Sequence, residues 1–500
     1  MTTSLNAARR RADLAALADR DSPLDMLVIG GGVTGAAVAL DAAARGLRVA
    51  LVEANDLAFG TSRWSNKILH SGLSYLTSGH LPMIMECARE RRILMTTVAP
   101  HLTSPLRHIY PLYGPEERAL RVRLGVSLGK MLRKASGTPA ELIPPPARIG
   151  ALDTIRLLPQ VRREGLRSSW STVDGQLVDD ARFVVALART AAAFGASVCT
   201  STRAENVTDY GARLVDTLTG EGFDVYARTV VNAAGRWAEG IDHEAILAQG
   251  GGTHLVIDAA RLGNPTAGLS VPLGNSVSDL VSILPAQLGR AYIGFTRGDF
   301  PAVGSVESQK SSSDIDVLLS AVNTALRVPL TPADILGTFP GGSDLADPTR
   351  RHRIWLSGTM VSVVGGTLTT YRRRAQETVD AAIAVGKLTA APCITETTPL
   401  IGASGFTPTA SLPDFAVARY GSETPAVFDR AKVDDPFGLV APGIDVTRAE
   451  IEFAVRHEGA LCVDDVLDRR TRIGLVAADA DKARRTVTDI VTETLADLST

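Results

Sequence analysis

Short apolar runs alternate with longer alanine-rich or amphipathic stretches near the beginning of the chain. Met26–Ile29 and residues 48–52 are short and apolar, a pattern typical of buried parallel strands. Residues 33–45 between them are rich in alanine and predict a helix, and Gly46 stands where a glycine commonly follows a helix. The pattern therefore predicts a strand–helix–strand unit, preceded by a short helix or arm over residues 1–20.

The same alternation continues along the chain and is typical of an α/β protein. Further helices are predicted over 81–99, from Asp179-Asp180 to Gly195, over 318–326 and after Tyr371. Further strands are predicted at 229–232, at 361–364 and, as several short strands, between 250 and 300. The proline run at 144–146 is interpreted as a surface loop, and the pattern beyond about residue 395 is mostly helical.

A glycine motif stands at the junction of the first strand and the first helix of this unit. Gly30, Gly32 and Gly35 form the spacing GxGxxG, and Glu53 ends the following strand. The first glycine permits a tight turn, the second lets the backbone approach a pyrophosphate, and the third lets helix and strand pack closely. A carboxylate in the position of Glu53 accepts hydrogen bonds from ribose hydroxyls. These residues predict a dinucleotide site, but they do not distinguish FAD from NAD.

Three later segments favour FAD. The first follows Glu53 and supplies hydroxyls and amides for a second phosphate and the flavin. The second is a strand with a small-residue turn, and the third is a glycine turn that enters a helix, with N–H groups that face the flavin pyrimidine. The cofactor-binding residues predicted in these segments are Thr61, Ser62, Ser65 and Lys67, then Ala234 and Gly235, then Gly366, Leu368 and Thr369.

Composition narrows the class of protein. A chain of 500 residues predicts about two to four domains. The formal net charge of −2 gives no basic field for nucleic acid. The four cysteines have no CxxC spacing, so we expect buried free thiols and no metal site. No signal peptide and no membrane-spanning helix is expected, and residues 116–134 are either an interfacial helix or an ordinary amphipathic helix that faces the core.

Together, these motifs resemble the FAD-dependent glycerol-3-phosphate dehydrogenases of the D-amino-acid-oxidase-like flavoprotein superfamily. The resemblance runs from about residue 5 to about residue 495. It is carried by the nucleotide motif, TSRWSNKILHSGLSYL at 61–76, Asp174-Gly175-Gln176, Asp179-Asp180-Ala181-Arg182, Gly252-Thr253-His254, GGTLTTYR at 365–372, and the segment from His457-Glu458 to Arg469-Arg470-Thr471-Arg472.

The resemblance implies an architecture of interleaved domains. A Rossmann-type FAD-binding domain alternates along the chain with a mixed-sheet substrate domain, and a helical domain follows at the C-terminus. The expected segments are 22–80, 166–245 and 351–390 for the FAD-binding domain, 81–165 and 246–350 for the substrate domain, and 395–500 for the C-terminal helical domain.

The resemblance also implies an activity. Family enzymes oxidise glycerol 3-phosphate to dihydroxyacetone phosphate, pass a hydride to FAD and deliver the electrons to a membrane quinone. His254 matches a histidine of the family's substrate pocket and is the candidate general base, since an imidazole suits removal of a proton from an alcohol. The other pocket residues expected by this match are Ser74, Tyr75, Arg297, Ser343 and Thr367.

Several of these pocket positions depart from the family's pattern. The family's arginines stand here as Ser74 and Ser343, and its lysine stands as Thr367. Arginine binds phosphate with two hydrogen bonds and lysine supplies a point charge, so their loss predicts weaker phosphate recognition, which Arg297 compensates in part. Three alternatives therefore remain: a glycerol-3-phosphate dehydrogenase, a flavin oxidoreductase with a less anionic hydroxy or amino substrate, or a poorly active FAD-binding protein.

Partners and location follow from the same resemblance. We expect a small-molecule substrate, a quinone or another electron acceptor, and a cytoplasmic protein. Peripheral contact with the inner face of the cytoplasmic membrane and formation of a homodimer are left open.

Overall fold

The computed structural model describes residues 3–19, 23–70, 81–113, 136–246, 249–273, 280–295, 312–344, 351–405 and 412–499. The amphipathic segment 116–134 and the predicted pocket residues Ser74, Tyr75 and Arg297 lie outside these ranges.

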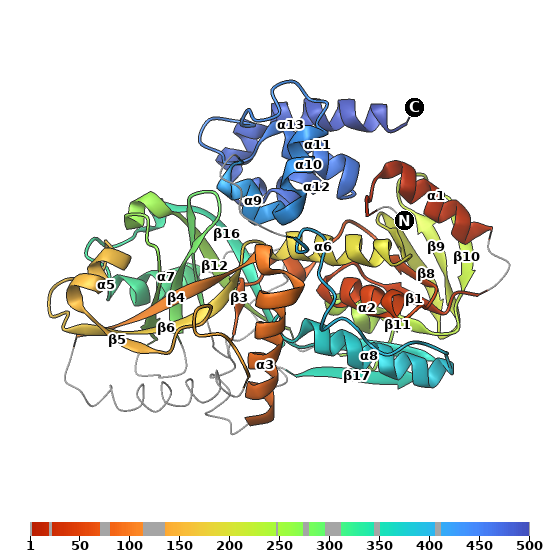
Figure 1. The fold of residues 1–500 in the computed structure, drawn as a ribbon, viewed down its shortest axis with the longest axis horizontal. Helices are drawn as coiled ribbons and strands as arrows, with labels where there is room; N and C mark the ends of the chain where they lie inside the picture. The colour runs from red at the N-terminus through yellow and green to blue at the C-terminus, as the bar shows by residue number, and fades with distance from the viewer. Residues whose placement is uncertain are drawn as a thin grey trace.

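A six-stranded sheet forms one side of the molecule, in the order β17-β18-β11-β1-β2-β7 (Figure 1). Its strands are β1 (Met26–Ile29), β2 (Val49–Val52), β7 (Ser197–Cys199), β11 (Val230–Asn232), β17 (His352–Ser357) and β18 (Met360–Gly365). Neighbours from β18 to β7 are parallel, and β17 runs antiparallel to β18. Three separate stretches of the chain therefore build this sheet.

Both faces of this sheet are covered, so its central strands β1 and β2 are apolar throughout. Met26 and Val28 of β1 belong to the core that contains helices α2 (Val33–Ala44), α6 (Asp180–Ala193) and α8 (Tyr371–Gly386). Leu27 and Ile29 point to the opposite face. There they pack with helix α1 (Ala7–Ala18) and with a three-stranded sheet of β8 (Thr202–Thr208), β9 (Gly211–Asp216) and β10 (Gly222–Tyr226).

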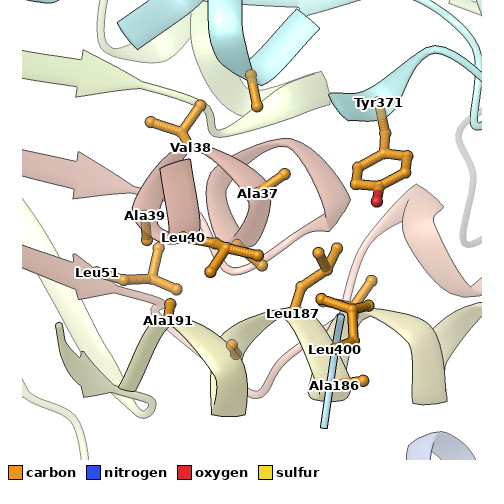
Figure 2. Close-up of a cluster of buried hydrophobic side chains, with 14 of the residues drawn as sticks. Ala37, Val38, Ala39, Leu40, Leu51, Ala186, Leu187, Ala191, Tyr371 and Leu400 are labelled. Atoms are coloured by element: carbon orange, nitrogen blue, oxygen red, sulfur yellow. The ribbon is translucent and has the colours of Figure 1, made fainter. Parts of the chain in front are cut away.

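The alanines of α2 explain how three helices fit on one face. Figure 2 shows Ala37 and Leu40 of α2 in one cluster with Leu187 of α6 and Tyr371 of α8. Small side chains let helix axes approach closely, and burying apolar area contributes about 25 cal/mol per Å². The helix predicted from the alanine-rich run is therefore confirmed, with Gly46 following it at a φ of +85°.

A second, mixed sheet forms the other side of the molecule (Figure 1). Its strands are β3 (Ile68–Leu69), β4 (Thr103–Leu112), β5 (Ala147–Gly150), β6 (Ser168–Leu177), β12 (Gln249–Asp258), β13 (Gly268–Pro272), β14 (Leu280–Ala286), β15 (Arg290–Phe295) and β16 (Ile335–Asp344). Helices α5 (Ala151–Leu157) and α7 (Ser312–Asn323) pack against it, and α3 (Leu81–Ile93) lies between the two sheets (Figure 1).

The last part of the chain is helical and lies across both sheets (Figure 1). Its helices are α9 (Asp414–Tyr420), α10 (Thr424–Asp429), α11 (Arg448–His457), α12 (Val463–Asp465) and α13 (Ala477–Asp497). The predicted fold class, an interleaved Rossmann-type domain and mixed sheet with a C-terminal helical domain, is thus confirmed. The residue bounds of the domains stay a prediction.

Some local expectations differ from the structure. The helix predicted over 318–326 begins earlier, at Ser312. The sheet of β8, β9 and β10 was not predicted, because its half-exposed strands carry many polar residues and a weak alternation. All four cysteines are free, but only Cys87 and Cys199 are buried.

Buried ion pairs join the C-terminal helices to the rest of the molecule. Asp56, just beyond β2, accepts hydrogen bonds from Arg470 Nη2 at 2.8 Å and from Arg469 Nε at 2.6 Å. Burial opposes ionisation of Asp56, but the two guanidinium groups outweigh it and hold the pKa below its ordinary value of 3.8. Arg182 of α6 pairs with Glu458 at 2.7 Å in the same interface.

We expect Asp56→Asn to lower the free energy of unfolding by about 3–5 kcal/mol, because it takes a carboxylate from two buried guanidinium groups, of which only Arg469 retains another close one among the described residues, that of Asp465. Urea denaturation at neutral pH measures this loss. Because the pKa of Asp56 is depressed in the folded state, its contribution is present above pH 3.8 and is lost as the pH falls through the lower folded-state pKa. Glu205→Gln removes the carboxylate of an exposed pair with Arg203 and is the control, with an expected change within about 0.5 kcal/mol. Equal losses in the two variants would show that the Asp56 cluster is not a principal contact.

Candidate active site

A cavity of about 1020 Å³ lies between the two sheets. The carboxyl ends of β1, β2, β11 and β18 line one side of it, and β12, β15 and β16 contribute residues to the other. Ligands of open α/β sheets bind at the carboxyl ends of the parallel strands. The volume is at the upper end of the range of about 300–1,000 Å³ that is usual for ligand pockets, as a long cofactor requires.

The glycine turn stands at one end of the cavity. Gly30 has a φ of +111°, and a Cβ atom there would lie 2.6 Å from the carbonyl oxygen of Ala233. A Cβ atom on Gly35 would lie 1.8 Å from the oxygen of Gly30, so Gly35 serves the close packing of helix on strand and does not line the cavity. Gly32 lines the cavity and precedes the first residue of α2.

Glu53 lines the cavity beside this turn. Its carboxylate accepts hydrogen bonds from the backbone N–H groups of Gly31 at 2.7 Å and Asn55 at 2.9 Å. Burial raises the pKa of Glu53, and these two N–H groups partly oppose the rise. Each oxygen keeps a lone pair for a further donor, such as a ribose hydroxyl. A Cβ atom on Gly31 would lie 2.8 Å from that of Glu53, so Gly31 is a site residue that the GxGxxG spacing did not single out.

The segment after Glu53 is fixed by a buried carboxylate. Thr61, Ser62 and Ser65 line the cavity as predicted, whereas Lys67 does not. Asp180 accepts hydrogen bonds from Ser65 Oγ at 2.8 Å and from Lys67 Nζ at 3.3 Å. The ammonium of Lys67 therefore binds a carboxylate within the protein, and this residue positions the segment.

The turns after β11 and β18 supply the next lining residues. Ala234, Gly235, Gly366 and Leu368 all line the cavity. Thr369 does not, because its Oγ1 accepts a hydrogen bond from the N–H of His70 at 3.0 Å.

His254 of β12 faces the cavity from the second sheet. Its ring is 7% exposed and stacks on Phe339 of β16, with centroids 4.8 Å apart and an interplanar angle of 8°. The neighbouring strands leave a slot for the ring, since Cβ atoms on Gly294 and Gly341 would lie 2.0 Å and 2.5 Å from its carbon atoms. The slot fixes the plane of the imidazole.

Neither ring nitrogen of His254 has a hydrogen-bond partner among the described residues. Burial, and to a smaller extent the charge of Lys67, lower the pKa of His254 to about 4, and Asp180 partly opposes this shift. The imidazole is therefore neutral at pH 7 and has a free lone pair. A buried polar side chain without partners at a cavity is typical of a residue that meets a ligand.

The remaining predicted pocket residues are only partly described. Thr367 lines the cavity, and its Oγ1 lies 3.2 Å from that of Thr370. Ser343 of β16 lies opposite Gly250 of β12 in the sheet, and its side chain is outside the described part of the chain. Arg374 of α8 lines the cavity but was not predicted. The sequence marks Arg374 as unusual only by its position, because a cation is disfavoured in the first turn of a helix.

Comparisons with known proteins agree with this geometry. A family model described as FAD dependent oxidoreductase matches residues 25–368, and a model described as the C-terminal domain of alpha-glycerophosphate oxidase matches residues 393–497. Glycerol-3-phosphate dehydrogenase 1 of Mycobacterium tuberculosis is 48% identical over 96% of this chain and 97% of its own. Glycerol-3-phosphate dehydrogenase of Mycobacterium leprae is 34% identical over 94% of this chain and 85% of its own.

The fold is also that of a solved flavoprotein. The glycerol-3-phosphate dehydrogenase from Bacillus halodurans, solved in complex with FAD, superposes with a TM-score of 0.72 at 23% identity, covering 99% of this chain and 97% of that one. The dinucleotide turn, the small-residue turns and a histidine opposite them fit FAD as the cofactor of this chain. On this geometry and these similarities, the chain belongs to the FAD-dependent glycerol-3-phosphate dehydrogenase family and is an oxidoreductase.

Proposed function

We propose that the protein oxidises glycerol 3-phosphate to dihydroxyacetone phosphate. The observation that carries the proposal is His254, which stands neutral and without a partner on the wall of the FAD cavity. The similarity to a relative named for this substrate, over nearly the whole of both chains, supports it. The alternatives of a less anionic substrate and of a poorly active protein gain no support from the relatives.

In this proposal, the residues on the two walls of the cavity have different roles. FAD, when bound, accepts a hydride. Gly32 and the N-terminus of α2 would hold its pyrophosphate, and Glu53 would accept hydrogen bonds from its ribose. The turn from Gly365 to Leu368 would lie against the flavin. His254 accepts the proton of the substrate hydroxyl at a free ring nitrogen, and burial of the ring excludes water from that atom.

The proposed electron acceptor is a membrane quinone, on the family resemblance. Peripheral contact with the inner face of the cytoplasmic membrane belongs to the same proposal. No helix within the described ranges is long and apolar enough to cross a membrane.

The first test concerns the cofactor turn. We expect Gly32→Val to fold but to bind FAD at least about tenfold more weakly, because its side chain blocks the approach of the pyrophosphate to α2. Its Cβ atom meets only the far end of Ser62, whereas that of Gly35→Ala meets backbone, so the second variant should also lose thermal stability. Flavin absorbance and circular dichroism measure the two effects. Gly150→Ala, with open space at its Cβ, is the control. A fully yellow Gly32→Val protein would place the pyrophosphate elsewhere.

The second test concerns the substrate. Glycerol 3-phosphate added without oxygen should bleach the flavin of the holoenzyme, because the hydride from the substrate reduces it. Glycerol, which lacks the phosphate, should bleach it at least about tenfold more slowly, a difference of about 1.4 kcal/mol in the barrier. Stopped-flow absorbance measures both rates. Equal rates with the two alcohols would favour a less anionic substrate, and no bleaching by either would contradict the proposed activity.

The third test concerns His254. A general base acts when it is unprotonated, so the bleaching rate should fall only as the pH falls through about 4 and should be level across pH 6.5, the ordinary pKa of histidine. The rate is measured at saturating substrate, because titration of the substrate phosphate changes its affinity. His254→Gln should lower this rate by about 100- to 10,000-fold and keep its FAD. An acid limb centred at 6.5, or a fast His254→Gln variant, would assign the proton to another group.

A further inference from the structure

Arg374 is a buried cation at the turn from Gly365 to Leu368, which the proposed function assigns to the flavin. It lies in the first turn of α8 and is 3% exposed. Its Nη1 donates hydrogen bonds to the carbonyl oxygens of Gly365 at 2.8 Å and Thr367 at 3.5 Å. A Cβ atom on Gly366 would lie 2.3 Å from the same nitrogen. The guanidinium is therefore packed directly against the turn, and it lines the cavity as well.

The described part of the chain supplies no opposite charge to Arg374. Its Nε has no hydrogen-bond partner, and no carboxylate of the described residues lies within ion-pair distance. The carboxylate of Glu377, one turn further along α8, is bound by His352 Nε2 at 2.8 Å and by Arg373 Nε at 2.7 Å. Burial alone lowers the pKa of Arg374 to about 10, so the group is charged at neutral pH.

The neighbour Arg372 shows the usual solution for a buried arginine. It is equally buried, and its Nη2 binds Glu90 Oε1 at 2.6 Å. A buried cation without such a partner is costly, because it gives up its hydration and receives no opposite charge. The N-terminus of α8 adds a second positive potential at the same turn, since the helix dipole is positive there. The unpaired guanidinium and the helix dipole both favour the binding of an anion in the cavity.

We infer that Arg374 provides a fixed positive charge to the flavin ring and stabilises its reduced form. In the proposed reaction the substrate C–H bond breaks, its hydride goes to FAD, the hydroxyl proton goes to His254, and a C=O bond forms. FAD gains two electrons and one proton, so its ring carries one additional negative charge. In a buried site, a nearby cation stabilises that charge more than it does in water. Arg374 thereby raises the midpoint potential of the bound FAD.

This inference rests on FAD and on the place of its ring, and it does not depend on the identity of the substrate. An anionic group of the substrate is the other source of negative charge in the cavity. The two sources are separated by measurements on the holoenzyme without substrate, because only the flavin is then present.

The test uses three substitutions at Arg374. Arg374→Gln removes the charge and keeps a donor for Gly365, Arg374→Leu removes the charge and keeps the packing, and Arg374→Lys keeps the charge. Arg373→Gln, on the same helix with an exposed side chain, is the matched control. The midpoint potential is measured by reduction against reference dyes. Titration with sulfite, which forms an anionic adduct with flavin, gives a second, spectroscopic measure.

We expect the two neutral variants to favour the reduced flavin at least tenfold less than wild type, which is about 30 mV for a two-electron couple. Their affinity for sulfite should fall at least tenfold as well. Arg374→Lys and Arg373→Gln should stay within about a factor of three of wild type, or about 0.65 kcal/mol. Circular dichroism and FAD content show which variants fold. If one of the two neutral variants does not fold, the other one decides the outcome.

Three results would overturn the inference. Neutral variants with the potential and sulfite affinity of wild type would show that the charge does not act on the flavin. A lysine variant that behaves like the neutral ones would show that hydrogen-bond geometry matters and charge does not. An unchanged potential together with a raised KM for glycerol 3-phosphate would assign Arg374 to the substrate phosphate.

Discussion

The buried carboxylate of Asp56 and its two arginines hold the parts of this molecule together. Asp56 lies four residues beyond β2, in the segment that follows Glu53, and Arg469 and Arg470 come from the C-terminal helices. Removal of Asp56 takes a carboxylate from both arginines in a buried interface, and within the described part of the chain only Arg469 retains another close one, Asp465 at 2.5 Å. The C-terminal helices therefore support the segment beside the cofactor site, although none of their described residues lines the cavity.

Stacked aromatic rings connect this interface to the candidate base, His254. Arg472, two residues beyond Arg470, lies over the ring of Trp64 with its guanidinium carbon 5.2 Å from the centroid. Trp64 lines the cavity and stacks on Phe339 at 5.8 Å, and Phe339 stacks on His254 at 4.8 Å. Planar groups stacked in this way restrict one another's rotation. The orientation of the imidazole therefore depends on packing that begins in the C-terminal helices.

Sequence reasoning succeeded where the determinants are local. The glycines of the turn and the alanines of α2 act on neighbours in the chain, so periodicity and spacing were sufficient to predict the strand–helix–strand unit. Lys67 shows where such reasoning ends. A lysine among hydroxyl residues near a nucleotide motif favours a phosphate contact, but Asp180, far along the chain, takes its ammonium. Likewise, the slot formed by Gly294 and Gly341 becomes visible only when three strands are paired.

The buried polar and charged groups of this protein fall into two classes, those that stabilise the fold and those that we propose to contact a ligand. Where a charge is structural, as at Asp56, Arg182 or Lys67, the fold supplies the opposite charge from a distant segment. Two other buried groups line the cavity: the neutral imidazole of His254 has no hydrogen-bond partner among the described residues, and Arg374 has no carboxylate partner among them. Leaving such groups unsatisfied costs stability, and the cost is recovered when a ligand provides the missing partner. In the proposed reaction the substrate hydroxyl is the partner of His254, and the negative charge of the reduced flavin is the partner of Arg374.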